Sequence, residues 1–457
     1  MSDSPGYEFW REYPDHDPQA VVWYPLTYGP LDVNTVWPQA GPEPKHETSL
    51  YIHIPFCAVI CPFCPFNKFA SVEKMMSEFV IAVKREIELL ASRSYWSNAH
   101  ISAAFFGGGT PTALSGERLA DIIETCRKLL RFSDDTELTV EGSPETLTPE
   151  KLKILRDVGV NRISFGVQSF DDHYLKMLGR GHNAATARKT IDMVADAGFD
   201  NVAIDLMYRL PGQTLEEVEK DLDTALRSGV SHISAYSLFV EPGSPLARVQ
   251  HRGKLLPLPD EETDLEMFRL VIDRLAQSNF ELYTLYDFAP PGRRCEHHVI
   301  NWHAPQKEYV GIGPGAFSFV RNGRDEFVYG NVNPLERYFD LLREGKLPID
   351  FGVHLSEEEQ MARYMVLGTN GLDIPKAPFE QRFGQSITSV FGETVDRLQG
   401  WGLVEDLPER VSLTRKGRLY LANVGKSFCT ERNRMKPHPA GVDLQKGAGQ
   451  SLIGINK

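Results

Sequence analysis

The sequence predicts an α/β fold in which about six strand–helix units form a partial (β/α)6 barrel of the TIM type. The first observation is an alternation of short apolar runs with amphipathic stretches between residues 47 and 240. The second is that reactive or ligand-binding residue types come directly after these runs, where parallel strands end at one shared edge. The third is a change to successive helical patterns after residue 350, which predicts a small second domain.

The chain divides into five predicted segments. An irregular arm, residues 1–46, is rich in proline, acidic and aromatic residues, and we expect it to pack on the body through Trp10, Trp23, Tyr24 and Trp37. The barrel core spans 47–240, and an accessory α+β segment, 241–350, extends the sheet or forms a lid. Residues 351–430 have the helix order and short hairpin of a winged-helix-like domain. The polar segment 431–457 is expected to be disordered.

The barrel strands follow from β-branched and apolar runs bounded by turn residues. The first leads into a cysteine-rich loop and then a helix whose apolar face includes Phe79, Val83 and Ile87. The second ends in a glycine run, after which Ser115 is a plausible N-cap for the next helix. Four further runs are each adjoined by a helical pattern. The predicted strands are Leu50–Ile54, Ile101–Phe106, Glu137–Glu141, Arg162–Phe165, Val202–Leu206 and Ile233–Phe239.

Composition indicates an ordinary globular protein with few of the features that nucleic-acid or membrane partners require. The 457 residues are 42% hydrophobic and 24% charged, with a formal net charge of −13. No apolar run approaches the ~18 residues of a membrane span, and the acidic balance disfavours binding to nucleic acid. Six cysteines are too sparse for a disulfide framework. We expect a cytoplasmic, monomeric protein in a reducing compartment.

Three clustered cysteines are the strongest chemical signal. Cys57, Cys61 and Cys64 form a C-x3-C-x2-C motif directly after the first strand. Three thiolates on one loop would leave one iron of a 4Fe–4S cubane without a protein ligand, and an open coordination position is where chemistry occurs. A zinc site with His53 as fourth ligand is the alternative. It is disfavoured because zinc ribbons carry paired C-x2-C knuckles.

The motif and its flanking aromatics, Tyr51 and Phe63, resemble the signature of the radical S-adenosylmethionine (SAM) superfamily. In that family the open iron chelates the amino and carboxylate groups of SAM, and an electron from the cluster yields a 5′-deoxyadenosyl radical. The resemblance therefore implies a 4Fe–4S cluster, SAM and a low-potential electron donor such as flavodoxin or ferredoxin. It also implies SAM contacts from residues at the strand ends, namely Gly108, Gly109, Thr110, Glu141, Gln168, Arg180 and Asp205.

Longer segments are similar to the oxygen-independent coproporphyrinogen III oxidase family, which includes haem chaperones and class C methyltransferases. These segments are Tyr51–Cys57, Gly107–Pro111, Arg162–Phe170, Ile204–Gly212 and Gly311–Phe317. The oxidases carry another cysteine where this chain has Phe66. The chaperone haem motif His-Asn-x-x-Tyr is here His297-His298-Val-Ile-Asn301. Both departures from the family motifs favour the class C methyltransferases over the oxidases and the haem chaperones.

The leading prediction is class C methylation, or methylene transfer in a cyclopropanation, onto an sp2 carbon of an aromatic, heteroaromatic or tetrapyrrole substrate. That branch uses two SAM molecules, and four apolar residues are candidates for the wall of a second SAM site: Phe66, Met207, Phe239 and Phe317. Oxidative decarboxylation of the coproporphyrinogen type and a haem chaperone remain the alternatives. Adjacent histidines such as His297 and His298 are more often surface residues than ligands. Arg293 and Arg294 are expected to lower the pKa of the Cys295 thiol.

Overall fold

A single large sheet organises the molecule. The structure, a computed structural model, describes residues 11–31, 33–37, 46–97, 99–240 and 244–434. Twelve strands follow the order β14-β13-β12-β11-β1-β4-β5-β6-β7-β8-β10-β9. The six strands from β1 to β8 in this order are parallel to one another. They are β1 (His46–Ile54), β4 (Ala99–Gly108), β5 (Phe132–Gly142), β6 (Arg162–Gln168), β7 (Val202–Tyr208) and β8 (His232–Ser237).

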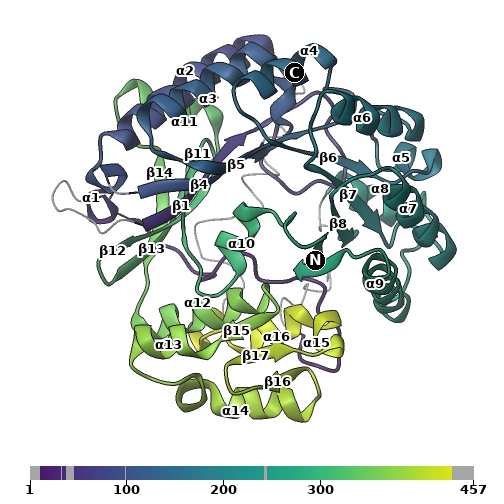
Figure 1. The fold of residues 1–457 in the computed structure, drawn as a ribbon, viewed down its shortest axis with the longest axis vertical. Helices are drawn as coiled ribbons and strands as arrows, with labels where there is room; N and C mark the ends of the chain where they lie inside the picture. Colours follow the sequence, from purple (N-terminus) through teal and green to yellow (C-terminus); the bar gives the residue numbers. More distant parts are fainter. Residues whose placement is uncertain (1–10, 32, 38–45, 98, 241–243, 435–457) are drawn as a thin grey trace.

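Helices cover the convex side of this parallel sheet, as the strand–helix alternation predicts (Figure 1). The predicted apolar face of the first helix is fully buried at Phe79, Val83 and Ile87. Ser115 caps the next helix by accepting a hydrogen bond from the Arg118 amide. The covering helices are α2 (Glu73–Ala91), α3 (Gly116–Leu129), α4 (Pro149–Asp157), α5 (Asp172–Met177), α6 (Ala184–Asp196), α7 (Leu215–Arg227) and α9 (Glu261–Ala276).

The accessory segment extends the sheet at both edges. Strand β11 (Glu308–Ile312) pairs in parallel with β1, and β12 (Phe317–Asn322), β13 (Asp325–Asn331) and β14 (Ile349–His354) continue it antiparallel. At the other edge, β10 (Asp287–Ala289) and β9 (Glu281–Thr284) follow β8. Helix α10 (Glu296–Trp302) contacts β1, β4 and β11 and lies near the centre of Figure 1, on the concave side. Helices α8 (Pro245–His251) and α11 (Leu335–Arg343) complete this segment.

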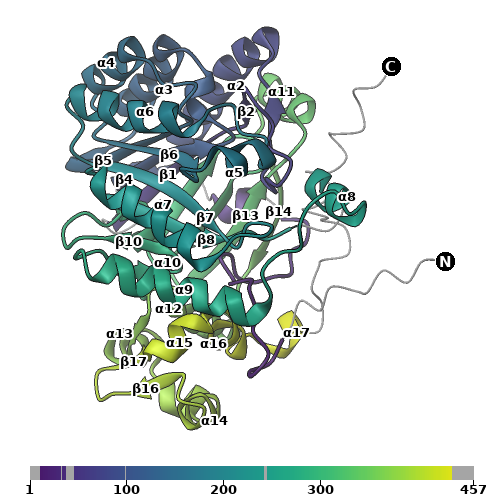
Figure 2. The ribbon, with the colours of Figure 1, turned by 90° about the vertical axis from the view of Figure 1, so that its right-hand side faces the viewer.

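The C-terminal domain lies at one end of the molecule, below the sheet in Figure 2. The order of three helices, a hairpin and a further helix matches the winged-helix-like prediction, and a short strand, β15, adds a third strand to the hairpin sheet. The elements are α12 (Glu357–Thr369), β15 (Asp373–Pro375), α13 (Lys376–Phe383), α14 (Ile387–Gly400), β16 (Val404–Asp406), β17 (Arg410–Leu413), α15 (Arg415–Leu419) and α16 (Leu421–Ser427).

The amino-terminal arm packs against both the sheet and the C-terminal domain. Trp37 is buried and lies edge-on to Tyr95, while Trp23 stacks on Phe317. Trp10 lies outside the described residues. A buried ion pair joins Asp17 to Lys426 at 2.6 Å, with side chains 3% and 2% exposed. No helix in the described part of the chain is both long and apolar enough to cross a bilayer.

The prediction of a disordered tail from residue 431 is wrong for its first four residues. Glu431–Arg434 form helix α17. Asn433 is fully buried there, where it accepts a hydrogen bond from the Leu26 amide at 2.8 Å and donates to the Tyr24 hydroxyl at 3.2 Å. A polar side chain is tolerated in the interior because the arm supplies its partners. The rest of the predicted tail, 435–457, lies outside the described residues.

Candidate functional site

The three cysteines follow β1 on a loop at the carboxyl edge of the sheet, beside two cationic side chains. Cys57 is buried in β2 (Phe56–Cys57), which pairs with β3 (Phe69–Ala70), while Cys61 and Cys64 are partly exposed. Arg180 Nη1 donates to the Cys61 sulfur at 3.2 Å, and Lys68 Nζ donates to the Cys64 carbonyl at 2.7 Å. Burial raises the pKa of Cys64, and the charge of Lys68 only partly offsets this effect. Burial raises the pKa of Cys57 to about 11, so this thiol keeps its proton until a metal displaces it.

The loop fits an iron–sulfur cluster better than a single zinc ion. Three thiolates can each hold one iron of a cubane, whereas a structural zinc ion needs four protein ligands. His53 is not a free fourth ligand, because its Nδ1 lies 3.1 Å from the Tyr51 hydroxyl and its Nε2 lies 3.0 Å from the Asn67 carbonyl. Burial lowers the pKa of His53 to about 4, which keeps it neutral.

The glycine run that ends β4 brings its backbone against the cysteine loop. A Cβ atom on Gly109 would lie 2.8 Å from the Phe56 carbonyl and 3.0 Å from the Cys57 sulfur. Gly108 has φ +119°, a backbone angle that residues with a side chain rarely adopt. A Cβ atom there would lie 2.8 Å from the His53 ring. The Thr110 hydroxyl lies 3.7 Å from the Cys57 sulfur. Only glycine lets these two strand ends approach so closely.

Two carboxylates face the barrel interior beside the glycine run. Glu141 accepts a hydrogen bond from the Gly108 amide at 3.2 Å. Burial, and then the charge of Asp205, raise the pKa of Glu141 to about 8. Burial, and then the charge of Asp287, raise the pKa of Asp205 to about 6. An interior that holds several acids favours a cationic ligand, such as the ammonium group of an amino acid.

Gln168 and Arg180 complete the same rim. Gln168 ends β6 with φ +72°, and its Oε1 accepts from the Tyr236 hydroxyl at 2.9 Å. Arg180 lies in the loop between α5 and α6, and its Nη2 donates to the Gly166 carbonyl at 2.7 Å and to the Ser143 hydroxyl at 3.2 Å. Through Nη1 the same guanidinium reaches the Cys61 sulfur. Arg180 is thus held at the cysteine loop rather than in solvent.

The four residues predicted to wall a second SAM site do not form one apolar cluster. Met207 packs with Leu178 and Leu210, and Phe63 packs against that cluster. Phe317 packs in a different cluster, on β12, and stacks on Trp23 with ring centroids 5.3 Å apart. Phe66 is 56% exposed on the cysteine loop, and Phe239 lies just after β8, partly buried.

Helix α10 overturns two expectations from the sequence. His297 is not a surface residue: the residue is 8% exposed, and its ring stacks on Phe105 with centroids 5.0 Å apart. Its Nδ1 lies 2.5 Å from the Ser49 hydroxyl and its Nε2 lies 3.1 Å from the Asn301 amide. The helix docks inside the barrel, so polar residues that the sequence pattern placed on the surface lie in the interior.

The second expectation concerned Cys295. Burial raises its pKa well above the ordinary value, opposite to the predicted direction. The neighbouring arginines turn away to pair with acids: Arg293 lies 3.2 Å from Asp200, and Arg294 lies 3.3 Å from Glu281. All six cysteines are free thiols, as the absence of a disulfide pattern predicts.

Comparisons with known proteins agree with this geometry. The profile of the radical SAM superfamily matches residues 51–225, and that of the HemN C-terminal domain matches residues 355–420. The chain is 34% identical to the haem chaperone HemW of Bacillus subtilis, across 84% of this chain and 99% of that protein. It is 32% identical to HemW of Lactococcus lactis, with 84% and 98% covered. Coproporphyrinogen III oxidase (HemN) from Escherichia coli has a similar fold, with a TM-score of 0.74 at 24% identity over 89% of this chain and 97% of that one.

Proposed function

This chain belongs to the HemN-like radical SAM family, and from this membership we propose that Cys57, Cys61 and Cys64 hold a 4Fe–4S cluster beside a bound SAM molecule. The cluster, when bound, supplies the electron that splits the sulfonium of SAM. The observation that carries the proposal is the convergence of the cysteine loop with Gly109, Glu141 and Arg180 at one edge of the sheet. Independent strand ends that meet in this way are typical of a barrel active site.

The protein's own residues position the reactants and balance charge. Arg180 and Lys68 offset the negative charge of the thiolates. Glu141, fixed by the Gly108 amide, would accept hydrogen bonds from the SAM ammonium group. Asp205 faces the same interior and would bind ribose hydroxyls. Gln168, held by Tyr236, and the buried strands exclude water from the reacting centre.

Haem handling is the first candidate for what the protein does with this centre. Its support is the similarity to proteins named haem chaperones, which extends over 99% of the Bacillus subtilis protein. The comparisons give no comparable support to methyl transfer, the leading prediction from the sequence. His297 would be the iron ligand, because it occupies the histidine position of the chaperone motif. To bind iron, His297 Nε2 would first have to lose its contact with the Asn301 amide nitrogen, which lies 3.1 Å away.

Transfer of a methyl or methylene group is the second candidate, and one specific observation favours it. Both ring nitrogens of His297 have partners within the chain, and its ring is stacked inside the barrel. A wide, flat macrocycle cannot reach that nitrogen without displacing α10. A small substrate that enters the polar interior beside Glu141 and Asp205 needs no such movement.

Two anaerobic measurements separate the candidates. In haemin titration followed by absorption, a chaperone binds one haem per chain, loses it in His297→Ala, and binds more tightly in Asn301→Ala. In the second assay, reduced, cluster-loaded protein receives methyl-deuterated SAM. Deuterium in 5′-deoxyadenosine together with S-adenosylhomocysteine supports the transfer reaction. Absence of 5′-deoxyadenosine in the wild-type chain, or its persistence in Cys57→Ala, would refute SAM cleavage at this site.

A further inference from the structure

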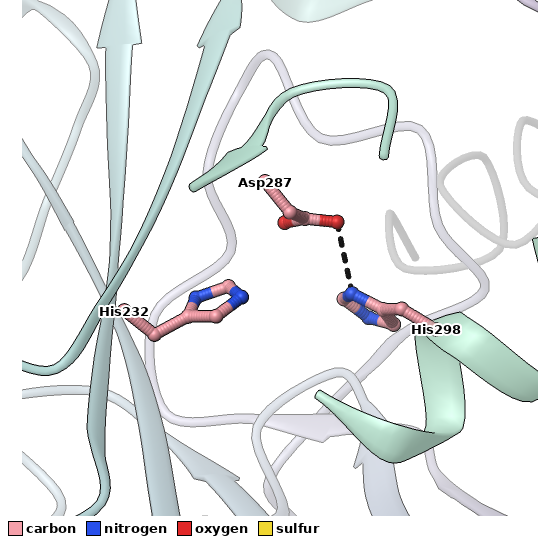
Figure 3. Close-up of side chains that lie close together, drawn as sticks. All are labelled: His232, Asp287 and His298. Atoms are coloured by element: carbon pink, nitrogen blue, oxygen red, sulfur yellow. Dashed lines mark ion pairs between the residues drawn. The ribbon is translucent and has the colours of Figure 1, made fainter. Parts of the chain in front are cut away.

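A second group of ligand-type side chains lies inside the barrel, apart from the cysteine loop. It consists of His232 from β8, Asp287 from β10 and His298 from α10, whose polar atoms converge in Figure 3. One ring nitrogen of each histidine and one carboxylate oxygen of Asp287 all lie within 4.8 Å of one another. We propose that these three residues bind a divalent transition-metal ion, Zn²⁺ or Fe²⁺, in addition to the cluster.

Several buried polar atoms of the group have hydrogen-bonding positions that no other residue fills. Asp287 Oδ1 accepts from the Ser234 hydroxyl at 2.6 Å. Asp287 Oδ2 and His298 Nδ1 form an ion pair at 2.9 Å, and neither atom has a further hydrogen-bond partner. His232 Nδ1 has no hydrogen-bond partner, although His232 and Asp287 are fully buried. Buried polar atoms without partners are rare in native proteins, and a bound ion is one of their ordinary explanations.

Two imidazoles and one carboxylate form the ligand set of catalytic zinc sites and of non-haem iron(II) sites. Bonds of 2.0–2.1 Å in a tetrahedral site place neighbouring ligand atoms roughly 3.3 Å apart. The 2.9 Å between His298 and Asp287 is close to that separation. Ser234 holds the carboxylate of Asp287, and the Tyr283 hydroxyl, 2.8 Å from Nε2, holds the ring of His232. Such outer contacts orient metal ligands in proteins.

The strand register places this group in the barrel interior, on the row that contains Glu141. Glu141 pairs with Ser164, Ser164 with Ala203, and Ala203 with His232. Paired residues of neighbouring parallel strands point to the same face, so His232 shares the concave face with Glu141. The His298 side chain is 18% exposed, which leaves an approach to an otherwise buried group. Three protein ligands leave a coordination position open to water or to an oxygen of the substrate.

Metal binding is measured on a full-length chain in which Cys57, Cys61 and Cys64 are replaced by alanine, so that no iron–sulfur absorption interferes. Near-ultraviolet circular dichroism verifies its fold. Co²⁺ is the probe, because its visible absorption reports its coordination, and Zn²⁺ then displaces it. We expect one Co²⁺ per chain with a four- or five-coordinate spectrum. Zinc content of the cluster-loaded wild-type protein after dialysis, also expected to be one per chain, is the second measurement.

The matched variants are His298→Asn and His354→Asn. His354 forms a similar His–Asp contact, 2.9 Å to Asp325, but on the surface, with side chains 53% and 58% exposed. We expect His298→Asn to weaken Co²⁺ binding by roughly 100-fold or more and His354→Asn to leave it unchanged. Absence of binding in both the folded parent and the cluster-loaded protein would overturn the proposal. So would equal binding in His298→Asn, and the group would then be a buried His–Asp pair.

Discussion

Glu141→Gln should make the SAM-free protein more stable while it weakens SAM binding. Burial and the charge of Asp205 raise the pKa of Glu141 from 4.5 to about 8. Between these values the unfolded chain releases a proton that the folded chain retains, so stability falls as pH rises. At about 1.4 kcal/mol per pH unit, the loss reaches roughly 4 kcal/mol near pH 8. Glutamine has nearly the same shape and no charge, so it removes this loss.

Thermal unfolding of the SAM-free wild type and Glu141→Gln, between pH 5 and pH 9, is the assay. We expect the melting temperature of the variant to exceed that of the wild type by an amount that grows from pH 5 to pH 8 and then levels. SAM should raise the melting temperature of the wild type more than that of the variant. A constant difference across this range, or a less stable variant at pH 8, would refute the reasoning.

Glu145→Gln is the control with the opposite sign. Burial alone would raise the pKa of Glu145, but hydrogen bonds from His182 and Ser143 lower it to about 2. The stability that this carboxylate contributes is present above its unfolded pKa and is lost as pH falls toward 2. We therefore expect Glu145→Gln to destabilise the protein at pH 7 and to matter less at pH 3.

Three further predictions concern the cysteine loop and the arm. Cys57→Ala should abolish cluster incorporation, measured as iron content, without loss of the folded circular dichroism spectrum. Gly109→Ala should lower the free energy of unfolding by roughly 1–3 kcal/mol and lower the iron content, because its Cβ would lie 3.0 Å from the Cys57 sulfur. Gly400→Ala is the control, because a Cβ there would have nothing within 4 Å, and it should change neither quantity. Similar results for the two variants would contradict this argument. Lys426→Met should lower the free energy of unfolding, measured by chemical denaturation, by roughly 3–5 kcal/mol, because it leaves the buried Asp17 carboxylate without its ion-pair partner. A loss below about 1 kcal/mol would show that the ion pair does not anchor the arm.

Local patterns in the sequence were sufficient for the scaffold and for the cluster loop. The barrel strands carry apolar residues that helices must cover, so the alternation of strands with amphipathic helices leaves few other arrangements. The three cysteines lie within eight residues, so their proximity needs no tertiary information. Glu141, Gln168 and Asp205 could be placed near the same edge because parallel strands end together.

Residues whose role depends on long-range packing escaped prediction. His232 begins a strand whose other residues are mostly apolar. Asp287 belongs to a three-residue strand, which is too short to show the alternation of polar and apolar residues that would predict its orientation. His298 faces them only because α10 docks inside the barrel. The exposed position expected for His297 and the lowered pKa expected for Cys295 failed for the same reason. A short helix of seven residues carries too little periodicity to reveal which side it buries.

The sequence by itself determined the parallel barrel, the cysteine triplet and the family, because these follow from periodicity and from ligands that are neighbours in the chain. Only the tertiary structure decided which polar side chains meet inside the barrel. Their meeting depends on the docking of α10 and on the two sheet extensions, through contacts between residues more than fifty positions apart, such as His232 and Asp287. The free energy of such contacts depends on burial and on the distances between charges in the folded protein. Neither can be deduced from a local sequence pattern.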